Sequence, residues 1–531
     1  MSPVASRIDI LLHLTLLLLL TLAASTNLNS SLQISAKIGQ TNPNYASWNV
    51  DSSYNRGFFH INFTNQNIRA AAQSLAPSTL RFGGTGNDYL FYDCETIPGK
   101  DNDFYGCLND THREALLALA STTGNDFLFG LSFDMAAACS VNDSSYVWSP
   151  NASITLMSNM KAAGQSVWGF ELGNEVNNHG AGGNQDCNLL PFQQSQAMNT
   201  LGKVLEATFP DVTTRPKFVG PDTGYHDAPN WLNSTLHATS GANGANLYAV
   251  THHVYPGIRR TNFNSPETLD RILRGDIQWY GPIVQEQAPN AQLWAGEDGP
   301  AAGGESGTCS GTEGDPHNIS ACGLYATVFW YADDLALRAA HGFKQYQRQD
   351  LVGGRYSLVR TLHDNEYEPA TASVILHPDF WVAFLWKRIV GASVLNATLS
   401  TSSPKTLRAY AHCGAPPSTF RVSGWEEGSE LSATLILINL DNSTTKTTRL
   451  SLPGVTSSLM WTMTSPVNGI FGENVLLNGK LLNSKVTNGA AIKDVPVAGI
   501  KGDGAQVDLP PLSVSFVVVK GVDSKILGQC L

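Results

Sequence analysis

The 531-residue sequence lacks an excess of basic residues, since 33 Lys and Arg face 44 Asp and Glu and the net charge is −11. Binding to a polyphosphate needs clustered cations, so the composition argues against nucleic acid as a partner. The eight cysteines lack CxxC spacing, which disfavours a zinc site. The 48 glycines and 26 prolines lack a repeat, which argues against a collagen-like or wholly disordered chain. What is present, 42% hydrophobic residues, suffices for a large core.

Only one long apolar run is present, at the N-terminus. Residues 11–22 are almost wholly apolar, follow Arg7 and precede the small residues Ala23, Ala24 and Ser25. This order is typical of a secretory signal peptide, which we place at residues 1–25, and the run is too short to span a bilayer comfortably. We therefore expect a secreted protein without stable membrane insertion; a retained anchor and a vacuolar or lysosome-like location are the alternatives.

Two further features agree with export. Nine Asn-x-Ser/Thr sequons predict N-linked glycans on the protein, at Asn29, Asn62, Asn109, Asn142, Asn151, Asn233, Asn318, Asn396 and Asn442. The even number of cysteines predicts disulfide bonds, the default state in that compartment. Proximity in the sequence favours Cys94–Cys107 and Cys309–Cys322, while the full connectivity stays open.

The spacing of apolar runs divides the chain into two parts. Between residues 45 and 395, strand-like runs alternate with helix-like stretches, at 45–50, 78–82, 127–131, 167–172, 217–220, 247–251, 292–296 and 342–347. About eight such units predict an α/β fold, a (β/α)₈ TIM barrel, with a doubly wound sheet as the competing layout. Residues 396–531 combine short strands with Ser/Thr-rich stretches and Asn-Gly turns, which predicts a C-terminal antiparallel β-sandwich domain. Because no low-complexity linker separates the parts, we expect a firm interface.

Two glutamates end predicted barrel strands, where barrel enzymes place their active sites. Glu175 follows the fourth strand in the stretch FELGNE (170–175), and Glu297 ends the seventh strand. Two carboxyl groups roughly 5–5.5 Å apart can hydrolyse a glycosidic bond with retention, one as the nucleophile and the other as the proton donor. Glu171 lies deeper on the same strand face and is predicted to be a structural carboxylate.

Other polar motifs carry weaker signals. The pair His252-His253 with Tyr255 has no matching acidic triad, so a wall of a sugar site is favoured over a metal site. The glycines at 83–86 lack the spacing of a dinucleotide fingerprint, and residues 303–307 do not form the GxSxG motif of serine hydrolases. We therefore predict neither a cofactor nor a metal.

Several motifs, in conserved order from about residue 45 onward, resemble the heparanase family of retaining β-glucuronidases. They are LRFGGT (80–85) followed by DYL (88–90), ELGNE (171–175), HHVY (252–255), WAGE (294–297), PDFW (378–381) and AHC (411–413). An Asn-Glu pair with a late strand glutamate indicates only a broad clan of barrel enzymes. The FGGT and PDFW blocks narrow the resemblance to this family.

The resemblance implies roles for the strand-end residues. Glu175 is expected to be the acid/base and Glu297 the nucleophile. Asn174 is expected to hold the sugar 2-hydroxyl, and Arg81 to lie beneath Glu297 and keep it ionised. The backbone N–H groups of Gly303 and Gly304, together with Tyr356, are expected to hold the glucuronate carboxylate. The implied substrate-binding positions are Asp51, Thr85, Tyr255, Gly303, Gly304, Gln349 and Tyr356, with His252 in a supporting role.

The resemblance also bears on the second domain. It implies that an N-terminal strand near residues 32–38 joins the sandwich and that Cys413 and Cys530 form a disulfide. By the entropy model, closing a loop of that size contributes roughly 4–5 kcal/mol.

Departures from the family narrow the expected substrate. Only a short loop occupies residues 95–115, where the animal enzyme carries an excised linker, so we predict an active, uncleaved polypeptide. Basic clusters that would grip a polysulfate are missing, which favours a weakly charged β-glucuronide, such as glucuronic acid on a plant-type arabinogalactan, over heparan sulfate. Val254 stands where the animal enzyme has an aromatic residue. The alternatives are a β-glycosidase for a neutral sugar and a catalytically idle glycan-binding protein.

Overall fold

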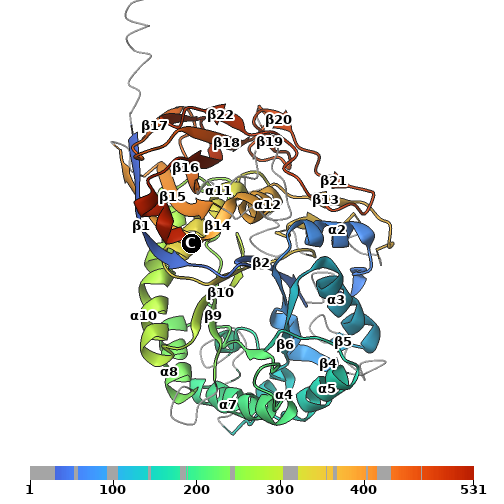
Figure 1. Ribbon diagram of the computed structural model, residues 1–531. Coiled ribbons are helices and arrows are strands. Elements are labelled where there is room, and N and C mark those ends of the chain that lie inside the picture. Colours follow the sequence, from blue (N-terminus) through green and yellow to red (C-terminus); the bar gives the residue numbers. More distant parts are fainter. Residues whose placement is uncertain are drawn as a thin grey trace, which may run out of the picture.

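The computed structural model describes residues 30–52, 58–92, 106–141, 145–179, 187, 189–239, 246–302, 321–353, 356–362, 368–401, 405–414, 432–467 and 469–530, and the account concerns these (Figure 1). Eight parallel strands form a nearly closed barrel in the order β8-β7-β6-β3-β2-β11-β10-β9. Isolated parallel bridges, Val219 to Ala249 and Thr223 to His252, join its two outer strands. The strands are β2 (Ala46–Asp51), β3 (Thr79–Gly83), β6 (Asp126–Leu131), β7 (Gly169–Leu172), β8 (Lys217–Phe218), β9 (Ala249–Val254), β10 (Gln292–Asp298) and β11 (Gln345–Arg348).

The barrel strands form where the sequence predicts them, because parallel strands are buried on both faces and so read as short apolar runs. Every residue of β2, β3 and β7 is buried. The closed order of strands excludes the doubly wound alternative, and the predicted (β/α)₈ barrel is confirmed.

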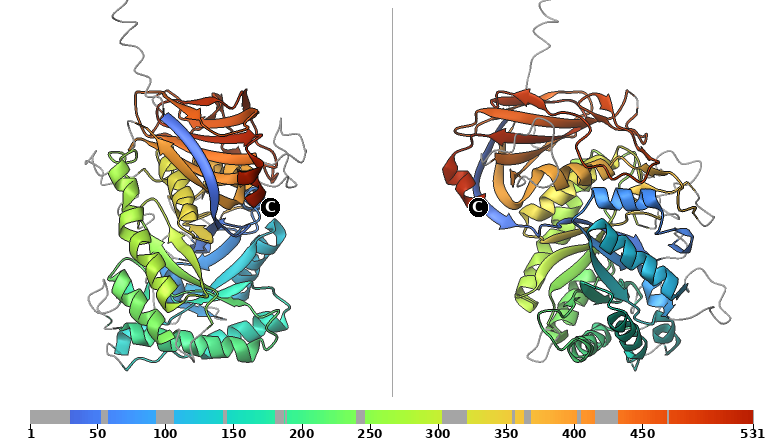
Figure 2. Two further views of the ribbon diagram at one scale, coloured as in Figure 1. Left: turned by 60° about the vertical axis from the view of Figure 1, so that its left-hand side comes forward. Right: turned by 45° about the vertical axis from the view of Figure 1, so that its right-hand side comes forward.

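Helices surround the barrel and separate it from the second sheet (Figures 1 and 2). Asn65 caps α2 by accepting from two backbone N–H groups, and Gly124 ends α3 with a φ of 75° that suits glycine. The helices are α2 (Gln66–Ser74), α3 (Asp110–Thr123), α4 (Met135–Val141), α5 (Asn151–Ala162), α6 (Val176–His179), α7 (Pro191–Thr208), α8 (Ala228–Thr239), α9 (Pro266–Ile272), α10 (Gln278–Gln287), α11 (Thr327–Ala340), α12 (Phe380–Ile389) and α13 (Ser524–Leu527).

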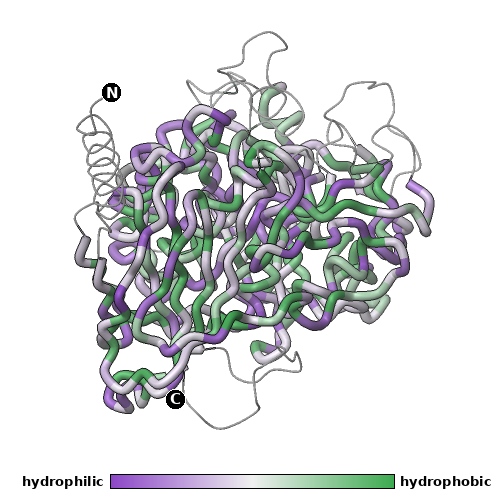
Figure 3. Tube along the Cα trace, turned by 90° about the horizontal axis from the view of Figure 1, so that it is seen from above, coloured by the Kyte–Doolittle hydropathy of each residue, from purple (hydrophilic) through white to green (hydrophobic). Residues whose placement is uncertain are grey.

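The C-terminal region is one eleven-stranded, mainly antiparallel sheet, ordered β20-β19-β18-β24-β16-β15-β14-β1-β17-β23 with β22 beside β18. Its long strands are β14 (Val390–Ser400), β15 (Leu407–Gly414), β16 (Ser432–Asn439), β18 (Ser457–Thr464) and β24 (Ser513–Lys520). The shorter ones are β17 (Lys446–Leu450), β19 (Leu476–Leu477), β20 (Lys480–Leu481), β22 (Ile500–Gly502) and β23 (Gln506–Leu509). Hydrophobic and hydrophilic segments are interspersed along these strands (Figure 3).

The N-terminal strand β1 (Ser30–Gln40) belongs to this sheet and not to the barrel. It pairs antiparallel with β14 and parallel with β17, so that Leu32 faces both Leu399 and Leu450. The strand that the family resemblance implies near residues 32–38 therefore lies within β1.

The sheet has an apolar core on each face. Ile436, Ile438 and Phe516 join the large core that includes the barrel and α11, while Leu435 and Val517 on the opposite face join a second core. Small sheets β4 (Leu90–Tyr92) with β5 (Gly106–Leu108), and β12 (Val359–Arg360) with β13 (Val374–Leu376) and β21 (Lys485–Val486), lie beside the main elements.

Polar contacts add to the junction between barrel and sheet. Arg408 on β15 lies 3.1 Å from Asp333 on α11 and 2.6 Å from Asp270 on α9, and the Tyr410 hydroxyl donates to Asp333 at 2.7 Å. Because α11 is buried along almost its whole length between the two parts, they meet in a firm interface.

Two disulfides are described in full. Cys413–Cys530 joins β15 to the C-terminal 3₁₀ turn η6 (Gly528–Cys530), and Cys139–Cys187, a pair that sequence proximity does not suggest, joins the end of α4 to residue 187. Cys107 and Cys322 are disulfide-bonded as well. Cys94 and Cys309, their expected partners, lie outside the described residues.

The predicted sequons differ in accessibility. Asn151, Asn233, Asn396 and Asn442 are exposed, whereas Asn62 is buried and its side chain accepts from Thr64. Asn109 caps α3, and Asn29, Asn142 and Asn318 lie outside the described residues. Within the described part of the chain, no helix is long and apolar enough to cross a membrane.

Candidate active site

Glu175 and Glu297 face each other at the carboxyl end of the barrel strands. Glu175 lies three residues beyond β7 in a left-handed conformation with φ +51°, and its N–H donates to the Asp222 carbonyl at 2.8 Å. Glu297 lies within β10. One carboxylate oxygen from each glutamate and one ring nitrogen of His253 all lie within 4.8 Å of one another. This separation suits the short carboxyl distance of retaining glycosidases.

Two donors hold the carboxylate of Glu297. Arg81 Nη1 donates to Oε2 at 2.8 Å, and the Tyr255 hydroxyl donates to Oε1 in a short hydrogen bond. The Glu297 side chain is only 5% exposed, so these contacts act in a nearly dry environment. The arrangement fixes the carboxylate in one orientation, as a nucleophile requires.

Glu175 is held by a different pair of donors. Its Oε1 lies 3.0 Å from His253 Nδ1, and its Oε2 accepts from Asn178 Nδ2 at 2.7 Å. Asn178 is itself oriented, because its Oδ1 accepts from the N–H of His226 at 3.0 Å. The Glu175 side chain is 17% exposed and is thus the more accessible of the two glutamates.

His253 connects Glu175 to the buried Asp222, since its Nε2 lies 3.2 Å from Asp222 Oδ1. Burial lowers the pKa of His253, but the neighbouring carboxylates, Glu297 first among them, outweigh burial and raise the pKa to about 10. A protonated imidazole offers no lone pair to a metal. Glu175, His253 and Glu297 are close enough to ligate a cation, but the neighbouring carboxylates favour the protonated imidazole, which donates to Glu175 instead.

Arg81 on β3 forms the base of the site. Its Nε donates to Glu171 at 2.6 Å, its Nη2 donates to Asn174 Oδ1 at 3.0 Å, and its Nη2 lies 3.6 Å from Asp222. Burial raises the pKa of Glu171 well above its ordinary value in spite of the Arg81 charge. Burial opposes ionisation of Asp222 too, but Arg81 and His253 outweigh it and lower the pKa of Asp222. Burial thus favours the neutral form of Glu171, whereas Arg81 and His253 favour the ionised form of Asp222.

Hydrogen bonds hold Asn174 through its backbone N–H and its Oδ1 but not through its Nδ2. Its N–H donates to Asp88 Oδ2 at 2.8 Å, and its Oδ1 accepts from Arg81, whereas its buried Nδ2 has no hydrogen-bond partner among the described residues. Burial raises the pKa of Asp88 to about 7, although the N–H groups of Phe133 and Asn174 favour its ionised form. An unpartnered buried donor beside Glu175 is a ready contact for a ligand oxygen.

Residues 34–336 match the family model for the N-terminal domain of glycosyl hydrolase family 79. The chain belongs to glycosyl hydrolase family 79. It is therefore a glycoside hydrolase, in agreement with the heparanase-family resemblance of its motifs.

The sequence similarity to known relatives extends over most of this chain and most of each relative. The glycosyl hydrolase is 24% identical to heparanase-like protein 1 of Arabidopsis thaliana, covering 88% of this chain and 86% of the relative. It is 23% identical to baicalin-beta-D-glucuronidase of Scutellaria baicalensis, with 87% and 84% covered. It is 26% identical to heparanase of Gallus gallus, with 95% and 98% covered.

Solved structures share the fold of the glycosyl hydrolase. A family 51 arabinofuranosidase from Xanthomonas axonopodis pv. citri superposes with a TM-score of 0.61 at 14% identity, with 93% of this chain and 99% of that chain covered. A 4-O-alpha-L-rhamnosyl-beta-D-glucuronidase from Fusarium oxysporum gives 0.57 at 14% identity, with the same two shares covered. At such identities the likeness establishes the (β/α)₈ architecture alone.

Asp51 is the centre of a second group of predicted substrate-binding residues. Its Oδ2 accepts from Gln349 Nε2 at 2.6 Å and from the Tyr356 hydroxyl at 3.3 Å. Gly84, with φ +116°, lets this carboxylate approach, because a Cβ there would lie 2.5 Å from Asp51 Oδ1. The Tyr356 ring lies beside that of Tyr255, with 6.4 Å between centroids. These side chains are therefore continuous with the surroundings of Glu297.

The remaining predicted positions differ in their placement. Thr85 begins the 3₁₀ turn η3 (Thr85–Tyr89) and is half-buried. Gly303 and Gly304 lie outside the described residues. His252 lies away from both glutamates, because its Nε2 is 2.9 Å from Asp276 and its Nδ1 is 2.7 Å from the Thr223 carbonyl.

The structure adds His253 and Asp222 to the residues at the site. Adjacent residues of a strand point to opposite faces, so an error of one position exchanges His252 for His253. Asp222 lies four residues beyond the two-residue strand β8 and has a left-handed backbone conformation with φ +53°. Its position at the carboxyl end of a barrel strand is the sequence signal that could have found it.

Proposed function

We propose that the protein is a secreted, N-glycosylated retaining β-glucuronidase that removes β-linked glucuronic acid from glycans through two displacements. The observation that carries the proposal is the approach of the Glu175 and Glu297 carboxylates to within 4.8 Å, with an unpartnered donor of Asn174 beside them. Retaining enzymes need that separation, because one carboxyl group must reach the anomeric carbon and the other the leaving oxygen.

In the first displacement, a Glu297 oxygen attacks the anomeric carbon while Glu175 gives its proton to the departing glycosidic oxygen. A covalent glycosyl-enzyme forms and the aglycone leaves as an alcohol. Arg81 and Tyr255 hold Glu297 in place by hydrogen bonds. Glu175 must carry a proton for this step, and the Glu297 carboxylate lies within 4.8 Å of it.

In the second displacement, Glu175 takes a proton from water, whose oxygen attacks the anomeric carbon and releases Glu297. Charge on Glu297 has by then been consumed in the covalent bond, so Glu175 is free to ionise. His253 and Asn178 then donate to its two oxygens. The sugar leaves as the β-anomer because the configuration inverts twice.

Substrate positions follow from the partners that the side chains lack. Asn174 Nδ2 is placed to donate to the 2-hydroxyl, a contact that strengthens in the transition state. Gln349 Oε1 is also buried without a partner among the described residues and can accept from another hydroxyl. The glucuronate preference draws on the relative that is named as a baicalin glucuronidase and on the match of Tyr356, Gly303 and Gly304 to family positions.

The test compares hydrolysis of nitrophenyl β-glucuronide, β-glucoside and β-xyloside by the purified protein. We expect the glucuronide to be preferred and proton NMR to detect the β-anomer first. Glu175→Ala and Glu297→Ala should each lower kcat by at least 10³-fold, and azide should rescue the two variants with products of opposite anomeric configuration. Xyloside turnover equal to or greater than glucuronide turnover would contradict the glucuronate preference. An unchanged kcat in both variants would show that neither glutamate is catalytic.

A further inference from the structure

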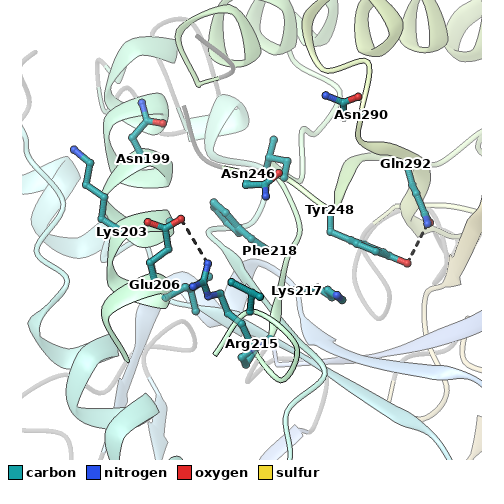
Figure 4. Close-up of a pocket in the computed structure, with 15 residues that line it drawn as sticks. Asn199, Lys203, Glu206, Arg215, Lys217, Phe218, Asn246, Tyr248, Asn290 and Gln292 are labelled. Carbon is teal, nitrogen blue, oxygen red and sulfur yellow. Dashed lines mark hydrogen bonds and ion pairs between the residues drawn. The ribbon is translucent and has the colours of Figure 1, made fainter. Parts of the chain in front are cut away.

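A cavity lies at the opposite end of the barrel from the two glutamates, where the strands begin. Its volume is about 750 Å³, and it is bounded by α7, by the start of β8 and by the residues that lead into β9 and β10 (Figure 4). Among its lining side chains are Lys203, Arg215, Lys217, Phe218, Tyr248 and Gln292. The catalytic groups end their strands, whereas these residues begin theirs, so the cavity is separate from the active site.

The seam between β8 and β9 lies beside this cavity. Strand β8 has two residues, Lys217 and Phe218, and two isolated bridges and several backbone hydrogen bonds connect this part of the chain to β9. Phe218 and Tyr248 flank the seam, and the Tyr248 N–H donates to the Phe218 carbonyl at 2.7 Å.

The cavity is positively charged, in contrast to the whole protein. Lys203, Arg215 and Lys217 contribute three cations, and Glu206, 3.6 Å from Arg215, contributes the one carboxylate among the lining residues, which leaves 3 − 1 = +2. The chain as a whole carries −11. Because salt screens charges over about 10 Å at 0.1 M, these local cations decide which ligand is attracted. An anionic ligand is favoured.

A fixed aromatic ring lies among the cations. Tyr248 packs edge-on against Trp168 and Trp294, with interplanar angles of 86° in both pairs. Its hydroxyl accepts from Gln292 Nε2 at 3.0 Å, and Lys217 Nζ lies 5.5 Å from the ring centroid. Amide side chains complete the lining, namely Asn199, Asn246, Asn290 and Gln292. Aromatic rings and amides are suited to the apolar faces and hydroxyls of sugars.

We propose that this cavity is a non-catalytic binding site for a uronate-bearing segment of the polysaccharide substrate. Lys203 and Lys217 pair with sugar carboxylates, and the amides bond to hydroxyls. The proposal rests on the proposed function, since it takes the substrate to be a glucuronate-bearing glycan. Two sites on one chain raise the effective concentration of the polymer at the enzyme. Polymeric substrates are therefore bound more tightly and hydrolysed faster, whereas small glucuronides, which reach only one site, are not.

The binding test uses a variant that cannot cut the probe, Glu175→Ala/Glu297→Ala. In that background, Lys203→Ala/Lys217→Ala is compared with Lys480→Ala/Lys501→Ala, which removes the same charge from exposed positions on β20 and β22. The probe in affinity gel electrophoresis is an arabinogalactan that carries β-linked glucuronic acid, alongside the same polymer after chemical reduction of its carboxyl groups. We expect the cavity variant to bind at least 5-fold more weakly, the control variant to bind unchanged, and the reduced polymer to bind poorly to all three proteins. Equal binding by cavity and control variants, or undiminished binding of the reduced polymer, overturns the proposal.

A second measurement separates this proposal from the proposed function. With otherwise wild-type protein, Lys203→Ala/Lys217→Ala should leave kcat/KM on nitrophenyl β-glucuronide unchanged and lower several-fold the rate on an arabinogalactan that carries β-linked glucuronic acid. A matching loss on the small substrate would place the lysines in the fold or the active site and overturn the proposal. Failure of the wild-type protein to hydrolyse the glucuronide would sink the proposed function, whatever the gels show about binding.

Discussion

Arg81 Nη1 on β3 reaches across the barrel interior to Glu297 Oε2 on β10, 2.8 Å away. Two other strands, β2 and β11, separate these strands in the sheet. Burial lowers the pKa of Arg81, but three surrounding carboxyl groups outweigh it and raise the pKa above its ordinary value. The guanidinium thus carries a permanent charge beneath the proposed nucleophile.

We expect Arg81→Met to be strongly destabilising, because it leaves buried carboxylates without their cation. Breaking a buried ion pair in this way costs about 3–5 kcal/mol. Arg81→Lys keeps the charge but cannot maintain three directed hydrogen bonds, so it should retain more stability and still lower kcat by about 10²-fold. Urea unfolding and steady-state kinetics measure the two effects. Equal kcat in Arg81→Lys and wild type would contradict the positioning role.

Asn174→Ala should lower kcat on β-glucuronides by about 10²–10³-fold, since it removes the donor proposed to contact the 2-hydroxyl. The matched test uses a 2-deoxy-glucuronide, which has no such hydroxyl. The variant and the wild type should hydrolyse this analogue at similar rates. A loss that is equal on both substrates would mean that Asn174 acts only through Arg81 or Asp88.

The raised pKa of His253 predicts that the folded protein loses stability at alkaline pH. The pKa of His253 is about 10 in the folded protein and about 6.5 when unfolded, so the folded state holds the proton more tightly. Its contribution is complete below about pH 6.5 and is lost as the pH rises through 10. His253→Gln should therefore be less stable at pH 6 and lack this part of the decline. Urea midpoints between pH 6 and 10 provide the measurement, with exposed His237→Gln as the control; a wild-type slope in His253→Gln would contradict the assignment.

The two fully described disulfides should differ in their contribution to stability. Cys413–Cys530 spans 117 residues and Cys139–Cys187 spans 48. By the loop-entropy model both contribute about 4–5 kcal/mol, and the longer loop contributes slightly more. Paired Cys→Ala variants, unfolded in urea without reductant, give the order. Cys413→Ala/Cys530→Ala should keep its kcat at low temperature, because both residues lie outside the barrel; a large fall in kcat would show that the bond supports the site.

The sequence predicts the barrel well because most of its strands are short apolar runs bounded by polar turns, although β11 is largely polar. Glu175 and Glu297 follow from the same pattern, since strand ends converge at one face of a barrel. The position of β1 came from the family resemblance instead, because pairing over more than 350 residues leaves no local pattern.

Single side chains within the site are harder to predict. His252 and His253 are chemically identical neighbours, and only the register of β9 decides which one meets Glu175. Asp222 depends on a left-handed backbone after a two-residue strand, which periodicity does not reveal. The partners of Asn178 and His226 likewise depend on a loop–loop contact that exists only after the barrel closes.

The placement of β1 between β14 and β17 has a consequence for biosynthesis. The ribosome makes this strand long before either neighbour, so its hydrogen-bonding edges wait while the whole barrel is translated. Completion of the sheet must therefore follow release of the C-terminal segments, and the earliest-made ordered strand is among the last to find its place.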